Sequence, residues 1–323
     1  MATTEFEQLP AQVEQARRIA EKLRRELGRE ICAFLEDPDV VEIALNPDGV
    51  LWVERVGAPM ERFGRMAAHQ AEAVMTTVAS VYKTTVTREN PILECELPLD
   101  GSRFEALIPP IVTSPSFTIR RKALRIFSLD DYVSAGIMTQ GQVAIVRRAV
   151  DSHRNILVVG STGSGKTTLT NAIIEYMAQA CPQERLVIIE DTAELQCKSD
   201  NNVILRATDQ VDMLRLLKAT MRLRPDRILV GEVRGPEALA LLKAWNTGHP
   251  GGVATVHADN AALGLMRLEE LVGEASLTPR QQTIARTVHL VIYIARTPTG
   301  RRVEEIMSVS GHDGQQYLTK KED

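Results

Sequence analysis

The sequence predicts an α/β fold, and three observations support this prediction. From residue 139 onward, short apolar runs typical of strands alternate with segments that have helical spacing. The first run, Ile156–Val159, leads into a glycine-rich loop and then into a helical segment. The residues before 139 instead show short strands separated by turns. Regular alternation implies a largely parallel sheet, so we expect that domain to follow a smaller α+β domain.

The first 128 residues predict the smaller domain. Residues 5–36 mix Glu, Arg, Ala and Leu, and Ile19, Leu23 and Leu27 recur at four-residue spacing, which predicts an amphipathic helix. That helix either packs on its own domain or docks on a membrane surface or a partner. Residues 46–49 (NPDG) predict a hairpin turn, because Pro fixes φ and Gly accepts a positive φ. A helix is also expected at 67–82, and strands at 93–97, 102–108 and 116–121.

The second domain is expected at 139–323, after a linker at 129–138 that carries no strong period. Its parallel strands are expected at 156–159, 186–189, 203–206, 228–230 and 253–256, and its helices at 167–180, 209–221 and 236–246. A hairpin is expected near the end, formed by 289–295 and 303–309. The predicted domains are therefore 1–128 and 139–323.

Composition narrows the class of protein. The chain has 323 residues, of which 44% are hydrophobic and 25% charged, as in globular proteins of two domains. The net charge of −4 argues against sequence-specific binding of nucleic acid, which calls for a basic excess. Four widely spaced cysteines predict neither a disulfide framework nor a zinc ribbon. Because no leader peptide or membrane-length apolar run is present, we expect a cytoplasmic location.

A phosphate-binding loop is the most specific motif. Residues 160–167 read GSTGSGKT and match G-x-x-x-x-G-K-[ST] between a strand and a helix. Backbone N–H groups of such a loop point at phosphate oxygens, and the helix N-terminus adds a positive dipole end. Lys166 is expected to reach the β- and γ-phosphates of ATP, and Thr167 to ligate Mg²⁺. The predicted nucleotide-binding residues are Gly160, Ser161, Thr162, Gly163, Ser164, Gly165, Lys166, Thr167 and Thr168.

Acidic residues follow two more of the predicted strands. Glu190 and Asp191 end one strand at the edge where open α/β sheets bind ligands. Glu190 is expected to hold Mg²⁺, directly or through water, although a cap or a surface ion pair is the alternative. Glu232 follows three apolar residues and Gly231, as in a Walker B strand, and is expected to orient or deprotonate the attacking water.

Histidine and arginine supply the remaining candidates. His257 follows the strand at 253–256 and is expected at the same sheet edge, where it could contact the γ-phosphate. His249 precedes that strand, and a purely structural role is the alternative for both histidines. Charge that develops on the phosphates also calls for an arginine, and the first domain offers Arg103, Arg120 and Arg121.

The order of these motifs resembles the secretion and type IV pilus ATPase superfamily. The segments that carry the resemblance are the phosphate-binding loop, IIEDTAEL at 188–195, MRLRPDRILVGEVRG at 221–235 and TGHPGGVATVHAD at 247–259. Residues 93–121 also resemble the end of that superfamily's N-terminal domain. Within the superfamily, Arg224-Pro225-Asp226 and His257-Ala258-Asp259 resemble the traffic ATPases of type IV secretion and conjugation more than the pilus motors.

The resemblance implies a RecA-like P-loop NTPase fold for the C-terminal domain and a homohexameric ring. It implies Mg²⁺-dependent hydrolysis of ATP that powers conjugative DNA transfer or type IV secretion, with inner-membrane components of the apparatus as partners and a peripheral location at that membrane. The residues that it places in catalysis are Lys166, Glu190, Glu232 and His257, with Arg103 and Arg120 near the γ-phosphate. Arg222 and Arg234 also match arginines of the superfamily, without an assigned contact.

Three other functions remain open. A type IV pilus motor has the same parts and is disfavoured only by the branch-specific residues. A DNA translocase or helicase of RecA-like fold is disfavoured by the acidic charge balance. A scaffold that binds ATP without hydrolysing it would need neither Glu232 nor His257.

Overall fold

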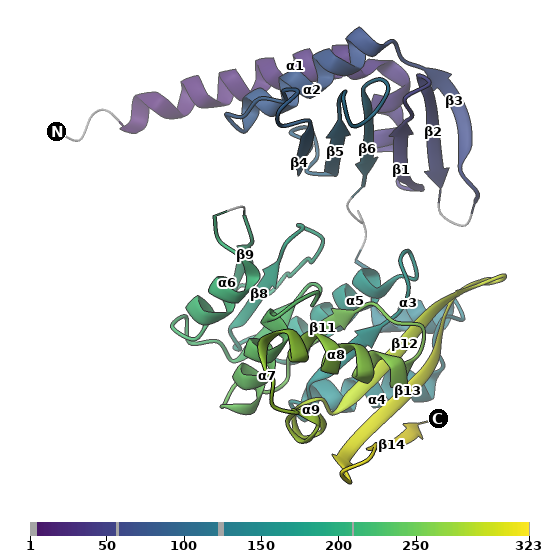
Figure 1. Cartoon of the computed structure of the whole chain (residues 1–323), viewed down its shortest axis with the longest axis vertical. Helices are drawn as coiled ribbons and strands as arrows, with labels where there is room; N and C mark the ends of the chain where they lie inside the picture. Colours follow the sequence, from purple (N-terminus) through teal and green to yellow (C-terminus); the bar gives the residue numbers. More distant parts are fainter. Residues whose placement is uncertain (1–4, 56–57, 122–125, 209, 323) are drawn as a thin grey trace. The chain divides into compact units, whose positions relative to one another are not determined.

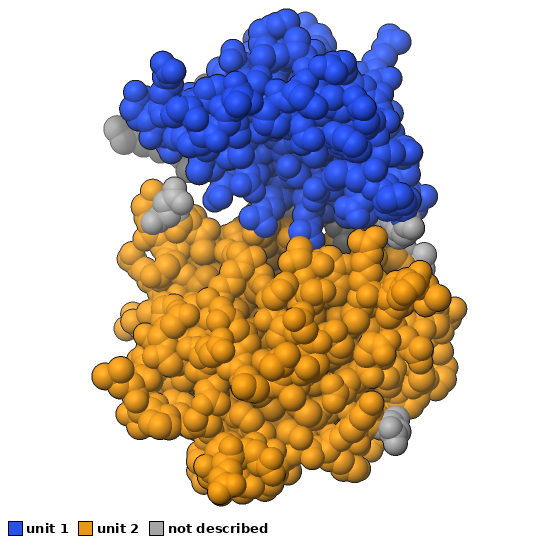
Figure 2. All heavy atoms as spheres, turned by 45° about the vertical axis from the view of Figure 1, so that its right-hand side comes forward, with its two compact units in different colours: residues 1–124 blue, residues 125–323 orange. Residues whose placement is uncertain are grey.

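The chain forms two compact units, Met1–Leu124 and Arg125–Asp323 (Figure 2). The computed structural model describes residues 5–55, 58–121, 126–208 and 210–322. The first unit holds a six-stranded antiparallel sheet, and the second holds an eight-stranded, mostly parallel one. The predicted fold, α/β after a smaller α+β domain, is therefore confirmed.

The first unit is a sheet with helices on one face. The strand order is β3-β2-β1-β6-β5-β4, where β1 is Val40–Leu45, β2 Val50–Arg55, β3 Glu61–Arg65, β4 Ile92–Glu96, β5 Arg103–Leu107 and β6 Ser116–Arg120. Helices α1 (Glu5–Glu36) and α2 (Ala68–Val81) cover one face of the sheet (Figure 1). Leu23 and Leu27 of α1 pack there against Ile43 and Phe104 of the strands in a single core. The predicted hairpin is confirmed, since β1 and β2 pair in antiparallel fashion around 46–49.

The second unit is built on a sheet with the order β14-β13-β12-β7-β11-β10-β8-β9. Its strands are β7 (Ile156–Val159), β8 (Leu186–Glu190), β9 (Asn202–Arg206), β10 (Arg227–Val230), β11 (Val253–Val256), β12 (Leu290–Thr297), β13 (Gly300–His312) and β14 (Tyr317–Glu322). From β12 to β9 all neighbours are parallel, and β13 and β14 are added in antiparallel fashion. The predicted strands and the hairpin at 289–309 are thus confirmed, whereas β14 was not predicted.

Helices cover both faces of this sheet. One core contains residues of α3 (Leu129–Ser134), α4 (Gln140–Asp151) and α5 (Lys166–Ala180). The other contains residues of α6 (Met213–Thr220), α7 (Glu237–Asn246), α8 (Ala261–Ala275) and α9 (Gln281–Thr287). Alternate residues of β7 enter alternate cores, which is why all four are apolar. Both cores anchor the strand ends that carry the candidate site.

Residues 129–138 belong to the second unit. Ser128 caps α3 through a reciprocal pair of hydrogen bonds with Asp131, and Leu129, Tyr132 and Met138 are buried in the core. The division into 1–128, a linker at 129–138, and 139–323 stays a prediction.

None of the helices in the described part of the chain is long and apolar enough to cross a membrane.

Candidate active site

Four parallel strands end side by side at one edge of the second sheet. They lie in the order β7-β11-β10-β8, and the residues that follow them are the phosphate-binding loop, His257, Glu232 and, as the last residue of β8, Glu190. Their register is close, since Val159 pairs with Val256 and Val230 pairs with Ile189. The sheet thus brings together the predicted residues from four separate segments, at the edge where open α/β sheets bind ligands.

The phosphate-binding loop is shaped by glycines. A Cβ at Gly160 would overlap with the carbonyl oxygen of Ile294 and with Ser164 Oγ, so no other residue fits there. Gly165 has φ of 100°, a left-handed conformation that other residues rarely adopt, and it leads directly into α5. Lys166 Nζ donates to the carbonyl oxygens of Gly160 at 2.8 Å and Ser161 at 3.1 Å. The lysine charge therefore lies inside the loop, where phosphate oxygens would be bound.

Thr167 contacts a carboxylate that was not among the predicted site residues. Its Oγ1 donates to Glu194 Oε2 at 2.9 Å, across 27 residues of sequence. Glu194 follows the end of β8 by four residues, within the segment IIEDTAEL. The signal in the sequence was a third acidic residue in that segment, after Glu190 and Asp191, but only a folded turn brings it back to α5.

The buried side chain of Glu190 stabilises this turn by hydrogen bonds to its backbone. Its side chain is 1% exposed, and Oε2 accepts the backbone N–H groups of Glu194 and Leu195, both at 2.9 Å. Burial raises the pKa of Glu190, although the two N–H groups and the charge of Arg206 act to lower it. Oε1 lies 3.9 Å from Arg206 Nε and has no hydrogen bond. Glu190 thus holds the 191–195 turn in place, and its predicted part in catalysis stays a prediction.

Glu232 lies in a surface network with Arg234. Arg234 Nε donates to Glu232 Oε2 at 2.8 Å, and Nη1 donates to Asp191 Oδ2 at 2.8 Å. Burial alone would lower the pKa of Arg234, but the hydrogen bond to Glu232 and the charges of Asp191 and Glu232 raise it. The arginine therefore stays charged and joins the carboxylates that follow β8 and β10. Arg234, which had no assigned contact, positions Glu232.

The two histidines lie at opposite edges of the sheet. His257 directly follows β11, is exposed, and makes no hydrogen bond to any described residue. His249 precedes β11, so it lies at the amino edge, away from the phosphate-binding loop. Because the strands are parallel, only His257 shares an edge with Lys166 and Glu232.

The arginines of the first unit divide into two groups. Arg103 and Arg120 face each other as a cross-strand pair of β5 and β6, on the face opposite the buried Phe104 and Ile119. Arg121 instead donates to the carbonyl oxygens of Asp37 and Val40, so it ties β6 to the start of β1. This contact assigns Arg121 a structural role, while the predicted approach of Arg103 and Arg120 to the γ-phosphate stays a prediction.

A second cation lies beside the loop and was not predicted. Arg301, on β13, has its Cδ 3.0 Å from where a Cβ of Gly165 would be, and its Nε donates to the carbonyl oxygen of Gly163 at 3.4 Å. No motif marks Arg301. Its position follows from β12, which pairs with β7 and carries the β13 hairpin to the loop.

The oxygen atoms near the loop fit a shared Mg²⁺ site. No cluster of three or more His, Cys, Asp or Glu in the described ranges is placed to hold a metal by itself. However, Thr167 Oγ1 and the Glu194 carboxylate are hard oxygen donors in direct contact, and Glu190, whose Oε2 accepts the backbone N–H of Glu194, has a buried Oε1 without a hydrogen bond. Mg²⁺ is usually held by one or two such groups together with waters and substrate phosphates. The donor set therefore fits Mg²⁺ held jointly with a nucleotide.

Known proteins match the chain over most of its length. The Type II/IV secretion system protein family matches residues 33–316. Conjugal transfer protein TrbB of Rhizobium radiobacter is 52% identical over 303 residues, which cover 94% of each chain. Protein VirB11 of Agrobacterium fabrum is 34% identical over 281 residues, covering 77% of this chain and 80% of VirB11.

A solved structure shares the fold. The X-ray structure of the ATPase DotB from Yersinia pseudotuberculosis superposes with a TM-score of 0.62 at 17% identity, covering 86% of this chain and 77% of that one. The resemblance inferred from the motifs is thus confirmed. The chain belongs to the Type II/IV secretion system protein family, with a RecA-like fold in its second unit.

Proposed function

We propose that the chain is an ATPase that hydrolyses ATP to ADP and phosphate with Mg²⁺. The observation that carries the proposal is the edge of the second sheet, where the Lys166 amine lies inside a glycine-shaped loop and the carboxylates of Glu190, Glu194 and Glu232 follow neighbouring strands. A cationic loop beside several carboxylates is the arrangement that phosphoryl transfer from a nucleotide to water requires.

Each residue has a distinct task in this proposal. The loop N–H groups and Lys166 bind the β- and γ-phosphates, and Thr167, with Glu194 as its hydrogen-bond partner, contributes to the Mg²⁺ site. When bound, Mg²⁺ neutralises negative charge on those phosphates. Glu232 orients the attacking water and accepts its proton, while Arg234 holds the carboxylate in place. His257 contacts the γ-phosphate, with Arg103 and Arg120 as further candidates.

The biological process is inferred from the relatives. TrbB of Rhizobium radiobacter is described as a conjugal transfer protein, and its 52% identity over 94% of both chains supports the same process for this one. We therefore infer a homohexamer that powers conjugative DNA transfer or type IV secretion from the cytoplasmic face of the inner membrane. Its partners are the inner-membrane components of that apparatus, and it reads no specific DNA sequence. A type IV pilus motor is the alternative.

Turnover measured against assembly tests the proposal. ATPase rate and molar mass are measured on the same samples over a range of protein concentrations. We expect the rate to rise as hexamers form and Lys166→Ala to lower it at least about a hundredfold, because the phosphates lose their cation. Lys321→Ala is the matched control, since Lys321 is exposed on β14, far along the sheet order from the loop.

Two results would overturn the proposal. Normal turnover by Lys166→Ala would show that the phosphate-binding loop is not the site of ATP hydrolysis. Full activity of a monomer would show that hydrolysis does not require a hexamer. The process itself is tested by complementation of a conjugative plasmid that lacks its TrbB-type gene. Transfer restored by the wild-type chain but not by Lys166→Ala supports conjugation, and failure of the wild-type chain argues against it.

A further inference from the structure

Arg301, near the start of β13, lies against the phosphate-binding loop. A Cβ at Gly165 would be 3.0 Å from Arg301 Cδ and 3.4 Å from Nε, so the arginine comes this close because Gly165 has no side chain. Nε donates to the carbonyl oxygen of Gly163 at 3.4 Å, which is long for a hydrogen bond. The other guanidinium nitrogens donate to no described residue, and Arg301 is exposed. One side of the arginine therefore rests on the loop, while the rest of the guanidinium is open to a ligand.

The order of the strands determines which way a bound nucleotide points. Glu232 follows β10 and Glu190 ends β8, and both of these strands lie on the β11 side of β7. β12 and β13 lie on the other side of β7. In the proposed function the γ-phosphate lies toward Glu232, because Glu232 orients the water that attacks it. The ribose and the base form the opposite end of the nucleotide, so they extend from the loop toward β12 and β13.

The β12–β13 hairpin is long enough to border that end of the nucleotide. β12 pairs with β7 up to Tyr293 and Val159, and it then continues to Thr297, beyond the end of β7. Figure 1 shows the hairpin reaching past the other strands of its sheet. Arg301 pairs with Arg296 in this projecting part. The hairpin thus forms a wall beside the phosphate-binding loop, and the Arg301 side chain crosses from the wall to the loop.

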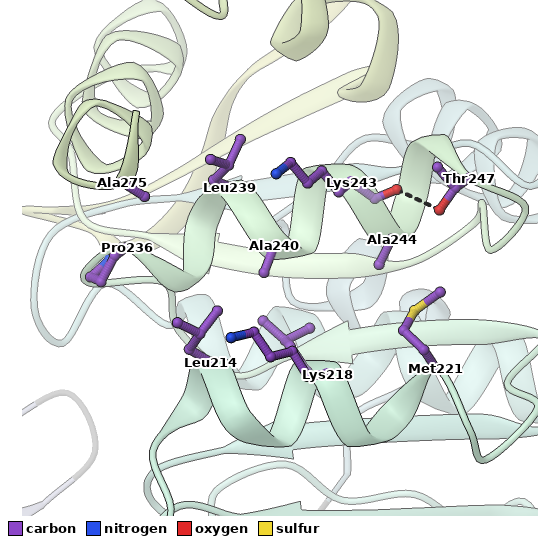
Figure 3. Close-up of a pocket in the computed structure, with 11 residues that line it drawn as sticks. Leu214, Lys218, Met221, Pro236, Leu239, Ala240, Lys243, Ala244, Thr247 and Ala275 are labelled. Carbon is purple, nitrogen blue, oxygen red and sulfur yellow. Dashed lines mark hydrogen bonds between the residues drawn. The ribbon is translucent and has the colours of Figure 1, made fainter. Parts of the chain in front are cut away.

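A hollow elsewhere in the second unit lies away from this wall. It is found between α6 and α7, and Figure 3 shows Leu214 and Lys218 of α6 opposite Leu239 and Ala240 of α7. Its lining residues come from these two helices and their ends, together with Ala275 of α8. None of them belongs to the phosphate-binding loop, β12 or β13. A nucleotide held by the loop therefore does not place its base in this hollow.

We propose that Arg301 binds the base of the nucleotide by stacking its guanidinium plane on the ring. The guanidinium is planar and cationic, and the π-face of an aromatic ring attracts it. The hydrogen bond to Gly163 and the contact with Gly165 hold the arginine beside the loop, while Lys166 binds the phosphates. Stacking does not depend on which base is present, because every base has a π-face. The inference rests on the proposed function, because it needs a nucleotide whose phosphates are bound by the loop.

Two ligands distinguish a contact with the base from a contact with the phosphates. The non-hydrolysable ATP analogue AMP-PNP carries a base, whereas inorganic tripolyphosphate does not. Their dissociation constants are measured by calorimetry in the presence of Mg²⁺. Arg301→Lys keeps the charge but removes the plane, so it should weaken AMP-PNP binding on the order of fivefold and leave tripolyphosphate binding unchanged. Arg302→Lys is the matched control, because the next residue of a strand points to the opposite face of the sheet.

The same assay separates this proposal from the proposed function. Lys166→Ala should weaken the binding of both ligands, because both carry phosphates. If it weakens neither, the loop is not the nucleotide site and the proposed function is wrong. If Lys166→Ala weakens both ligands while Arg301→Lys affects the two ligands equally, or affects neither, the stacking contact alone is wrong.

Photolabelling locates the base directly. An ATP derivative with an azide on the purine ring is bound to the full-length protein and irradiated, and the labelled peptides are identified by mass spectrometry. We expect label within β12 or β13, suppressed by excess ATP and lost in Lys166→Ala. Label that excess ATP suppresses but that lies only outside these two strands would overturn the proposal.

Discussion

Charged side chains are partly exposed at the carboxyl edge of the second sheet, whereas the arginine at its amino edge is buried. At the carboxyl edge, Lys166, Glu194 and Glu232 are partly exposed, and each makes a hydrogen bond to a neighbouring residue that is itself partly exposed or exposed. At the amino edge, Arg227 is 0% exposed and is surrounded by partners. Both edges belong to the same strands, because β10 begins with Arg227 and is followed by Glu232 after one intervening residue.

At the amino edge, the buried guanidinium of Arg227 has several hydrogen-bond partners. Arg227 donates through Nε to Glu184 and through Nη1 to the carbonyl oxygens of Val150 at 3.0 Å and Gly251 at 3.1 Å. His153 Nε2 lies 2.7 Å from Glu184 Oε1. Although burial raises the pKa of Glu184, hydrogen bonds and charge from Arg227 and His153 outweigh it, so the pKa lies below its ordinary value.

The contrast suggests that the two ends of one strand serve different purposes, with residues at the amino edge stabilising the fold and residues at the carboxyl edge taking part in catalysis. A buried ion pair is costly unless its hydrogen bonds are complete, so the amino edge tolerates little change. Side chains that must exchange partners when a nucleotide binds need weaker, exposed contacts, and these lie at the carboxyl edge. The comparison predicts that substitutions at the amino edge act on the free energy of unfolding, and those at the carboxyl edge on turnover.

The largest effect is expected for Arg227→Leu. It leaves Glu184, whose side chain is 15% exposed, without its main partner, which should lower the free energy of unfolding by about 3 kcal/mol. Turnover per folded molecule should change little. Urea unfolding and ATPase rate are measured on the same preparation.

The double variant Arg227→Leu, Glu184→Gln sharpens this test. It should regain part of the loss, because no unpaired carboxylate remains. A single variant as stable as the wild type would show that the amino edge does not depend on this pair, and the contrast between the edges would fail.

The next effect concerns the carboxyl edge. Glu232→Gln should lower turnover at least about a hundredfold, since an amide cannot accept the proton of the attacking water. The free energy of unfolding should stay close to that of the wild type, because Glu232 is partly exposed and its pairing with Arg234 is a surface contact. Glu270→Gln on α8, which removes another exposed ion pair, is the matched control. A Glu232→Gln protein with normal turnover would move the role of base to Glu190 or Glu194.

The sequence anticipated the row of strand ends but not the contacts between them. Lys166, Glu190, Glu232 and His257 could be placed at one edge because parallel strands point the same way, whatever the loops do. Glu194 could not be placed, since its approach to Thr167 depends on a turn that backbone bonds to Glu190 hold. Strand alternation carries no information about how a turn folds back.

The sequence analysis also missed two arginines, Arg301 and Arg227, whose surroundings come from segments far away in the sequence. Arg301 reaches the phosphate-binding loop because β12 pairs with β7, a pairing across more than a hundred residues that no local pattern signals. Arg227 was not singled out either, because a charged residue at the start of a strand is usually exposed. Its burial follows from Glu184, Val150 and Gly251, which come from three other segments.

The smallest effect is expected from His289, which belongs to the amino edge. Its Nδ1 accepts the backbone N–H of Asn155 at 3.0 Å, and burial, reinforced by the charge of Arg154, lowers its pKa from 6.5. The unfolded chain therefore binds a proton at higher pH than the folded one. The stability contribution of this histidine is fully present above pH 6.5 and is lost as the pH falls through the lower folded-state pKa.

His289→Asn should flatten this pH dependence, because the asparagine Oδ1 can still accept the hydrogen bond but does not titrate. Free energies of unfolding measured in urea from pH 8 to pH 5 should agree with the wild type at the alkaline end and exceed it at the acidic end. His69→Asn, at an exposed position on α2, controls for the loss of a histidine as such. Parallel profiles for the wild type and His289→Asn would show that the amino edge tolerates a proton at this position, and its dependence on complete pairing would then be confined to Arg227 and Glu184.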